Sequence, residues 1–308
     1  MGTPDFAVES LKILVENKYN VVGVITMPDK PAGRGHKLQH SAVKQYAINN
    51  NLPLLQPEKL KEESFLNDLK SWNADVQVVV AFRMLPEVVW NMPKHGTFNL
   101  HASLLPQYRG AAPINWAIIN GEKITGATTF FLTHEIDTGK IILQEKIEIA
   151  ETDNAEIVHD KLMMLGAEMV RKTIDIIKAG ETDGIDQEVF IQNIKVLKSA
   201  PKIFKETCEI DFNRCLVDVY NFIRGMSPYP TAWKEIQFPN QSNKVILKIY
   251  AAEKEFVEHE FSVGEVITDY KKFAKIAVQD GFILLKSVQV PGKKRMEIGE
   301  LLRGMRID

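Results

Sequence analysis

An amide and an imidazole stand two residues apart in the first third of the chain, where an apolar segment ends. Asn99 and His101 belong to TFNLHAS (97–103), a run typical of a buried strand. Because alternate residues of a strand point to the same face, both side chains are expected to project together where the chain leaves the sheet. The asparagine amide donates two hydrogen bonds, and histidine can donate or move a proton near neutral pH. Such a pair can stabilise an oxygen that becomes negative in a tetrahedral intermediate.

A carboxylate that could orient and charge the imidazole follows later. Asp137 lies in EIDTG (135–139), a tight turn between two segments of strand-like alternation. An Asn-x-His pair on a strand is more often structural than catalytic, and an aspartate in such a turn most often bonds to its own backbone. The three residues are therefore candidates for acid–base and oxyanion chemistry, and the surrounding sequence has to decide between the two interpretations.

Alternating strands and helices in the first half of the chain would hold these residues in place. Helical spacing of apolar residues predicts helices over 6–16, 41–49, 62–71, 113–120 and 155–179. Short β-branched or apolar runs predict strands over 19–26, 52–56, 75–82 and 97–103, followed by an antiparallel pair over 126–136 and 139–149. This order predicts an α/β fold with a doubly wound, mostly parallel sheet, which binds ligands beyond the carboxyl ends of its strands.

The pattern changes after residue 180. Residues 181–200 mix polar residues without a clear period and indicate a linker. Beyond it come short alternating segments separated by turn signals such as QDG (279–281) and PGKK (291–294), which favour a small OB-like β-barrel. The sequence thus predicts a catalytic domain over 1–180, a linker over 181–200 and a β-barrel domain over 201–308.

Composition excludes several classes of protein. Apolar residues make up 45% and charged residues 25% of the chain, as in ordinary globular proteins. No run of 18 apolar residues predicts a membrane span, and the two cysteines form neither a disulfide framework nor a metal signature. We therefore expect a cytoplasmic protein without a membrane partner. Because the net charge is only −2, a polyanionic partner would have to bind a local basic patch.

The start of the sequence departs from the expected fold. A doubly wound domain normally opens with a strand, whereas this chain passes from Gly-Thr-Pro (2–4) directly into a predicted helix. Either the first strand belongs to a segment outside this sequence, or the fold tolerates its absence.

The string NLHASLLPQYRGAAP (99–113), followed by Asp-Thr-Gly thirty-six residues after His101, closely resembles the folate-dependent formyltransferases. MGTPDFA (1–7), MPDKPAGRG (27–35) and SPYPTAW (227–233) resemble the branch of that family that acts on methionyl-tRNA. The resemblance covers essentially the whole chain.

This resemblance implies a Rossmann-like catalytic domain that transfers the formyl group of 10-formyltetrahydrofolate to the α-amine of methionyl initiator tRNA. Asn99 and protonated His101 would stabilise the oxyanion, while Asp137 keeps His101 charged and helps to move the proton to the departing folate nitrogen. The folate serves as co-substrate, and neither a metal nor a covalent enzyme intermediate is needed. We expect the protein to act as a monomer.

The family's folate site maps onto two segments. The first comprises Ser103, Leu104, Leu105 and Pro106, where an apolar slot with backbone donors at its rim would suit a flat pteridine. The second is AFRMLP (81–86), one residue shorter than in many family members and with Arg83 in place of a glycine. The contacts made by residues 82–85 are therefore expected to differ.

A basic loop is the predicted contact with nucleic acid. PDKPAGRGHKLQ (28–39) contains Lys30, Arg34 and Lys37, which could contact a phosphate backbone. The resemblance implies that this loop enters the acceptor arm of the tRNA, with Arg34 as its key side chain. An arbitrary basic loop would more often be a solvated surface segment.

Three alternatives remain open. A formyltransferase with the same core could act on an amino sugar nucleotide or on a ribonucleotide amine. A non-catalytic RNA-binding protein could have kept the scaffold, although the intact set of Asn99, His101 and Asp137 argues against this. A nicotinamide dehydrogenase is disfavoured because no GxGxxG motif follows a first strand.

Overall fold

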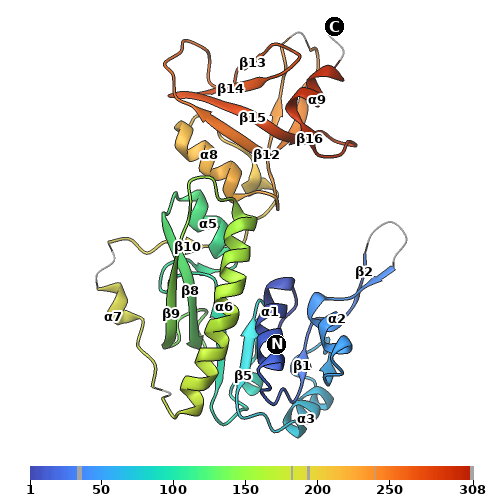
Figure 1. Ribbon diagram of the computed structural model, residues 1–308, viewed down its shortest axis with the longest axis vertical. Helices are drawn as coiled ribbons and strands as arrows, with labels where there is room; N and C mark the ends of the chain where they lie inside the picture. The colour runs from blue at the N-terminus through green and yellow to red at the C-terminus, as the bar shows by residue number, and fades with distance from the viewer. Residues whose placement is uncertain (33–36, 182, 193–194, 240, 306–308) are drawn as a thin grey trace. The chain divides into compact units, whose positions relative to one another are not determined.

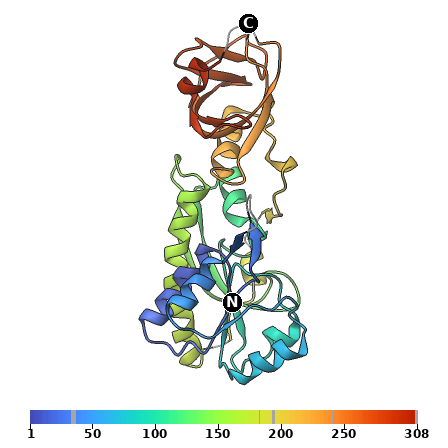
Figure 2. The ribbon, with the colours of Figure 1, turned by 90° about the vertical axis from the view of Figure 1, so that its right-hand side faces the viewer.

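The computed structural model describes residues 1–32, 37–181, 183–192, 195–239 and 241–305. The chain forms two compact units (Figures 1 and 2). Unit 1 comprises residues 1–110, 126–147 and 159–199, and unit 2 comprises 111–125, 148–158 and 200–308. The domain boundaries at residues 180 and 200 stay a prediction. No helix in the described ranges is both long and apolar enough to cross a bilayer.

Unit 1 holds the α/β elements. Their order is α1 (Asp5–Glu16), β1 (Val24–Ile25), β2 (Lys30–Ala32), β3 (Lys37–Gln39), α2 (Ala42–Asn49), β4 (Leu54–Leu55), α3 (Glu63–Ser71), β5 (Gln77–Val80), α4 (Glu87–Trp90), β6 (Thr97–His101), β7 (Arg109–Gly110), β8 (Ile124–Phe131), β9 (Ile141–Glu148), α6 (Ala155–Lys178) and α7 (Glu188–Ile191). A few terminal residues of β8, β9 and α6 are grouped with unit 2. The polar segment that was predicted to be a linker thus contains a short helix, α7.

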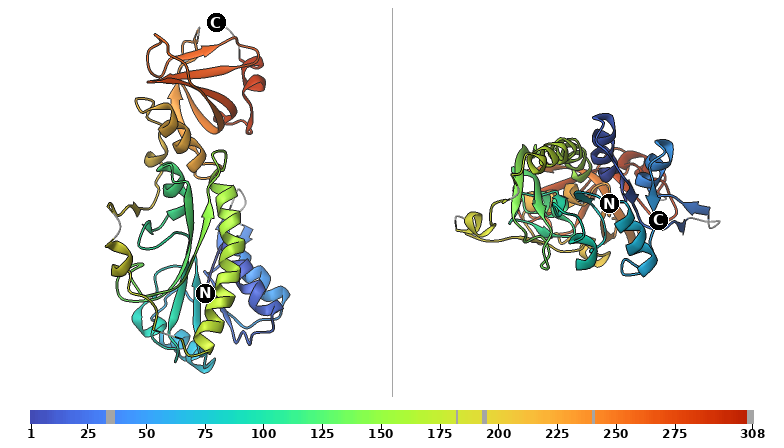
Figure 3. Two further views of the ribbon diagram at one scale, coloured as in Figure 1. Left: turned by 60° about the vertical axis from the view of Figure 1, so that its left-hand side comes forward. Right: turned by 90° about the horizontal axis from the view of Figure 1, so that it is seen from below.

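The predicted α/β class is confirmed. Strand β6 pairs in parallel with β5 and antiparallel with β8, and β9 completes a sheet of order β5-β6-β8-β9. Strands β1 and β4 form a separate parallel pair. Helix α6 packs on β6, since a Cβ at Gly166 would lie 2.6 Å from the Leu100 side chain. Figure 3 shows α1 and α6 on one side of the sheet and α3 on the other.

Local sequence explains why α2 begins where it does. The Ser41 hydroxyl accepts a hydrogen bond from the Lys44 backbone N–H at 3.0 Å and so satisfies one of the free donors of the first turn. Val43 and Ala47 form the buried side of this helix. The helix thus matches the range 41–49 predicted from the sequence, with Ser41 as its capping residue.

Unit 2 is mostly antiparallel β-structure. It contains α5 (Pro113–Ile119), η1 (Glu206–Cys208), α8 (Leu216–Gly225), β11 (Ala232–Ile236), β12 (Val245–Glu255), β13 (Val266–Thr268), β14 (Ala274–Val278), β15 (Gly281–Gln289), β16 (Met296–Glu297) and α9 (Ile298–Arg303); β10 (Ser199–Ala200) lies at its border. The strands run in the order β11-β12-β15-β14-β13, with β16 paired to β15. A register shift near Ala251 bends β12. The sheet curls as a half-barrel, so the predicted small barrel is present in open form.

Helices α5 and α8 pack closely within unit 2. A Cβ at Gly225 would lie 2.7 Å from the Ile119 side chain, so only glycine permits this approach. The Asn115 amide donates to the Gly225 carbonyl at 2.7 Å, which fixes the crossing. The fully buried Leu216 and Ile223 place the inner side of α8 in the core of unit 2.

The first two residues of the chain lie between β1 and β5. The Met1 α-amino group donates to the Val78 carbonyl at 2.6 Å, and the Gly2 N–H donates to the Ile25 carbonyl at 3.0 Å. Burial lowers the pKa of this α-amino group from 8.0 to about 5. The amine is therefore neutral at pH 7 in the folded chain, whereas it is largely charged in the unfolded chain.

This difference predicts a pH-dependent stability. Between pH 5 and 8 the unfolded chain binds a proton at Met1 that the folded chain does not, so the free energy of unfolding should rise with pH across this range. The total change in the free energy of unfolding between pH 8 and pH 5 should be at most about 4 kcal/mol.

Urea unfolding at several pH values, with the Nα-acetylated protein as control, measures this effect. Mass spectrometry first establishes that Met1 is retained. The acetylated protein has no titrating amine and should lack this component of the pH dependence. Equal pH dependence in the two forms would contradict a buried, neutral amine.

Candidate active site

Strand β6 separates an apolar face from a polar one. Phe98 and Leu100 are buried on one face, and Leu100 packs beneath α6. Asn99 and His101 therefore share the opposite face, as the alternation of a strand requires. Asn99 lies opposite Val79 of β5, and His101 lies opposite Thr128 of β8. The pair thus sits at the carboxyl end of an interior strand.

His101 is held between two oxygen acceptors. Its ring, with the residue only 7% exposed, places Nε2 at 2.9 Å from the Tyr108 carbonyl oxygen. Because a carbonyl oxygen only accepts, we assign the Nε2 proton to this bond. On the other side, Nδ1 lies 3.8 Å from Oδ2 of Asp137. This distance is within ion-pair range but longer than a hydrogen bond, so a small approach would close it.

Asp137 is fixed by the backbone as well as by its neighbours. The Gly110 N–H donates to Oδ2 at 2.9 Å, which leaves Oδ1 without a partner in the described residues. Asp137 has a φ of 55° and Tyr108 a φ of 60°, so both residues that face His101 adopt the left-handed region. Such conformations cost free energy and persist where the surroundings determine them, often at functional sites.

Gln187 supports the loop that presents Asp137. Its buried amide donates to the carbonyl oxygens of Asp137 and Gly139, both at 2.9 Å. Its Oε1 accepts from Nε and Nη2 of Arg109, at 3.1 and 2.6 Å. One side chain thereby joins the Asp137 turn to the segment after Tyr108. No sequence signal indicated this role, because residues 181–200 have no periodic pattern.

The Asn99 carboxamide is available to a ligand. It is half-buried, and its side chain makes no hydrogen bond to any residue that the structure describes. Its two donors can therefore bind an oxygen placed above the strand end. The described part of the chain contains no group of three His, Cys, Asp or Glu side chains arranged to hold a metal ion.

The segment predicted to contact folate is firmly attached to the sheet. The Thr128 hydroxyl donates to the Ser103 carbonyl at 2.7 Å and accepts from the Leu105 N–H at 3.1 Å. The Gln144 amide donates to the Leu105 carbonyl at 2.9 Å. Leu105 is only 1% exposed and packs with Phe130 and other buried residues. The loop is thus positioned by its backbone, and Leu105 supports it from the core.

The neighbouring segment 81–86 presents an exposed apolar side chain. Arg83 turns away to donate to the carbonyl oxygens of Pro57 and Glu58, and its guanidinium lies over the Phe82 ring. The next residue, Met84, is 74% exposed. Ile136, in the Asp137 turn, is also largely exposed. Exposed apolar residues on both segments provide surface that a flat ring system could cover.

The predicted tRNA loop is described only in part. Lys30 lies in β2 and Lys37 in β3, two strands that pair antiparallel, and Arg34 lies outside the described residues. The preceding Asp29 is bound by Lys44, Gln56 and His40. Hydrogen bonds from Lys44 and Gln56 hold the pKa of Asp29 well below its usual value. The base of the hairpin is therefore anchored to α2 and to the segment after β4.

Known protein families account for both parts of the chain. The family model described as "Formyl transferase" matches residues 1–174, and "Formyl transferase, C-terminal domain" matches residues 202–306. A protein of Bacteroides thetaiotaomicron named methionyl-tRNA formyltransferase is 63% identical over 307 residues, which are 100% of this chain and 95% of that protein. A protein of the same name from Flavobacterium psychrophilum is 53% identical and covers 99% of this chain and 95% of its own length.

Solved structures share the fold at lower identity. WlaRD, described as a sugar 3N-formyl transferase, aligns with a TM-score of 0.62 and 21% identity over 95% of this chain and 97% of its own. An N-formyltransferase from Helicobacter canadensis aligns with a TM-score of 0.62 and 20% identity over 92% of this chain and 96% of its own. The site residues thus lie on a fold that these transferases share, and the family models and the relatives together show that the chain belongs to the formyl transferase family.

Proposed function

We propose that this protein transfers the formyl group of 10-formyltetrahydrofolate to the α-amine of methionyl initiator tRNA. The observation that carries the proposal is the position of His101 within ion-pair distance of Asp137 at the end of β6, with Asn99 on the same face of that strand, in a chain with this family membership. Identity of 53–63% to proteins named methionyl-tRNA formyltransferase, across nearly the whole chain, supports this acceptor. We place the protein in the cytoplasm, because its tRNA acceptor is made there. We propose that it acts as a monomer.

In the proposed reaction the methionine amine attacks the formyl carbon. A new C–N bond forms, and the formyl oxygen becomes an oxyanion. The Asn99 amide donates to this oxygen. When substrates bind, the His101 ring gives up its hydrogen bond to the Tyr108 carbonyl and turns so that an N–H donates to the oxyanion. Each such donor contributes roughly 10²–10³ in rate, because the developing charge is stabilised in a site that excludes water.

Collapse of the intermediate then breaks the bond between the formyl carbon and the folate nitrogen. The proton lost by the attacking amine has to reach that nitrogen, and tetrahydrofolate leaves. Asp137, held by the Gly110 N–H, keeps a negative charge beside His101 and moves this proton, directly or through a water. The atoms balance without a metal, a redox partner or a covalent enzyme intermediate.

We assign folate binding to the loop of residues 103–106 and to segment 81–86. The backbone of the first is fixed by Thr128 and Gln144, so its groups can serve as ready-placed donors and acceptors. In the second, the exposed Met84 and the neighbouring Ile136 offer apolar surface to the flat ring system. Arg83 is already bound to Pro57 and Glu58 and is not a folate contact in this assignment.

We assign tRNA binding to the basic segment of Lys30, Arg34 and Lys37. Cations of this kind bind phosphates irrespective of sequence and position the substrate. The anchoring of Asp29 by Lys44 and Gln56 provides a rigid base for such a contact. WlaRD is a sugar 3N-formyl transferase crystallised with dTDP and 5-N-formyl-THF, and it shares only the fold with this chain, at 21% identity. An amino sugar nucleotide is therefore the alternative acceptor to be tested against tRNA.

Transfer of a labelled formyl group tests the proposal directly. Labelled 10-formyltetrahydrofolate is incubated with the protein and either methionyl initiator tRNA or an amino sugar nucleotide. We expect label on the tRNA and none on the sugar. Label on the sugar alone would overturn the assigned acceptor, and no transfer to either would overturn the assigned reaction.

Removing either oxyanion donor should abolish most turnover. We expect Asn99→Ala and His101→Ala to fold and to lose roughly 10²–10³ in kcat, because each deletes one donor. Asn67→Ala, at an exposed position of α3, is the matched control and should retain full activity. A variant of Asn99 or His101 with kcat close to that of the unchanged protein would show that the residue has no such role.

Gln187 should act as a positioning residue. In Gln187→Glu a carboxylate of the same shape replaces the amide that donates to Asp137 and Gly139, so the turn should lose its support and kcat should fall about tenfold or more with little change in KM. Because Asp137 moves with the turn, the pH–rate profile should change as well. The exposed Gln192→Glu is the control. A loss of stability with unchanged kcat and pH profile would reduce Gln187 to a purely structural residue.

Arg34 should affect only the use of tRNA. We expect Arg34→Ala to raise KM for methionyl-tRNA severalfold, and to make the reaction less sensitive to salt, while the Kd for a folate analogue stays the same. Steady-state kinetics at several salt concentrations and calorimetric titration with the analogue measure both quantities. A parallel loss of folate affinity would point to misfolding instead.

A further inference from the structure

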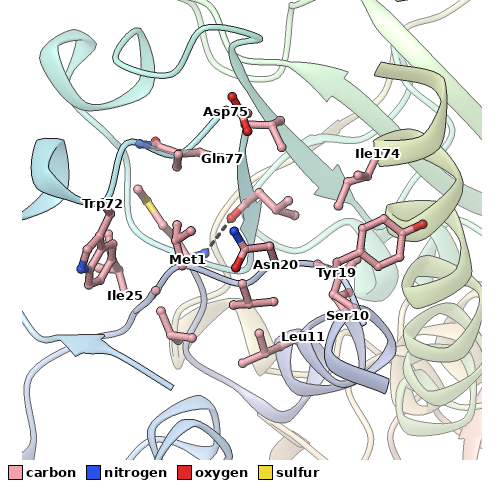
Figure 4. A pocket seen from close by; sticks show the side chains of 18 of the residues that line it. Met1, Ser10, Leu11, Tyr19, Asn20, Ile25, Trp72, Asp75, Gln77 and Ile174 are labelled. Atoms are coloured by element: carbon pink, nitrogen blue, oxygen red, sulfur yellow. Dashed lines mark hydrogen bonds between the residues drawn. The ribbon is translucent and has the colours of Figure 1, made fainter. Parts of the chain in front are cut away.

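Unit 1 contains a cavity of about 590 Å³ around Met1. Figure 4 shows Trp72 and Ile25 on one side of Met1 and Tyr19 and Ile174 on the other. The side chains that line this cavity are mainly apolar, and none of the candidate catalytic residues is among those described there. The charged groups of an acceptor therefore have to be bound elsewhere in the protein.

Arg109 lies between the two residues that contact the catalytic pair. The Tyr108 carbonyl oxygen accepts from His101, and the Gly110 N–H donates to Asp137. Tyr108 has a φ of 60° and Gly110 a φ of 125°, so the backbone on both sides of Arg109 is in the left-handed region. These contacts fix the position of the Arg109 backbone beside the candidate active site.

The Arg109 side chain is held by a neutral group. Gln187 Oε1 accepts from its Nε and Nη2, which leaves the other N–H groups of the guanidinium available. Arg109 is half-buried and makes no ion pair with a carboxylate in the described part of the chain. Arg171 of α6, by contrast, is paired with both Glu168 and Asp175.

A half-buried cation without a counter-ion indicates that an anion binds there. Partial burial of a charge costs free energy unless an opposite charge compensates it. The planar guanidinium is suited to phosphate, and the contact with Gln187 fixes its orientation before a ligand arrives. Arg109 is thus a prepared donor group beside Asp137.

The acceptor in the proposed reaction supplies such an anion. In methionyl-tRNA the reacting amine belongs to a methionine esterified to the ribose of the terminal adenosine. The nearest phosphate is attached to the same ribose. When the amine reaches the formyl carbon beside Asn99 and His101, this phosphate has to lie near the site as well.

We propose that Arg109 binds the phosphate of the terminal nucleotide of the acceptor and thereby orients the amine for attack. This assignment rests on the proposed function. The many other phosphates of tRNA maintain binding when one contact is lost, so the contact acts mainly on kcat, through the alignment of the amine with the formyl carbon.

A cycle between one side chain and one phosphate tests the proposal. One substrate is ordinary methionyl initiator tRNA, and the other has an uncharged methylphosphonate in place of the phosphate before the terminal adenosine. Single-turnover rate constants for formyl transfer, with tRNA and folate donor saturating, are measured for the unchanged protein and for Arg109→Gln. Arg171→Gln is the control, because Arg171 already has two carboxylate partners.

In the unchanged protein and in Arg171→Gln, the methylphosphonate substrate should react about tenfold or more slowly than ordinary tRNA, because a charge-assisted contact is lost. In Arg109→Gln the two substrates should react at about the same rate. The ratio of the two rates isolates the phosphate contact, because a disturbance of Gln187 slows both substrates alike. Equal rates in the unchanged protein, or an undiminished ratio in Arg109→Gln, would overturn the proposal.

A lysine variant covers the case in which Arg109→Gln does not fold. The ammonium group of Arg109→Lys keeps the charge but cannot form the two-pronged contact with Gln187, so the cation loses its fixed position. The ratio of the two rates should therefore fall severalfold. A ratio as large as in the unchanged protein would contradict the proposal.

The glutamate tail of the folate is the competing anion. Calorimetric titration of the Arg109 variant with a folate analogue, with and without its glutamate, decides between the two. We expect both analogues to bind as they do to the unchanged protein. A loss of affinity confined to the analogue with glutamate would assign Arg109 to the donor and overturn the proposal.

The same experiment separates this assignment from the proposed function. Failure of the unchanged protein to formylate ordinary methionyl-tRNA would contradict the proposed function itself. Normal transfer together with an undiminished ratio in the Arg109 variant would contradict only the role of Arg109.

Discussion

The position of one buried imidazole sets the requirements for the rest of unit 1. His101 lies between the carbonyl oxygen of Tyr108 and the carboxylate of Asp137, with almost no contact with water. A polar ring in such a place needs an acceptor on each side, since an unpaired buried donor costs free energy. The chain supplies both acceptors from residues in left-handed conformations, and a third residue, Gln187, holds the second of them in place. Strain in the backbone is thus offset by a network of hydrogen bonds around one side chain.

The sheet explains how residues from distant parts of the sequence meet there. Strand β6 is interior, parallel to β5 and antiparallel to β8, so its carboxyl end adjoins the loop after β5 and is flanked by the residues of β8. Thr128 of β8 and Gln144 of β9 tie the loop of residues 103–106 back to the sheet. The turn between β8 and β9 brings Asp137 to the same edge. Rigid strands therefore place the polar groups, while loops supply the surface for ligands, a division common to α/β enzymes.

Sequence patterns predicted the features of the fold and of the candidate site that depend on local periodicity. The alternation of β6 was enough to put Asn99 and His101 on one face. The support given by Gln187 could not be predicted, because it depends on four long-range hydrogen bonds from a segment without period. The attachment of Leu105 to Thr128 was equally hidden, since any polar residue on β8 would look alike in the sequence. The open form of the sheet in unit 2 depends on pairing at its ends, which short alternating segments do not specify.

Asp137 acts through His101 in the proposed reaction, and a double-mutant cycle in single-turnover formyl transfer tests this claim most directly. The rate constant is measured for the unchanged protein, His101→Ala, Asp137→Asn and the double variant, with saturating folate donor and methionyl-tRNA. If the two side chains work as one unit, the double variant will be little slower than His101→Ala alone, and the losses will be far from additive. Additive losses would contradict the claim, because Asp137 would then contribute to the rate independently of the imidazole.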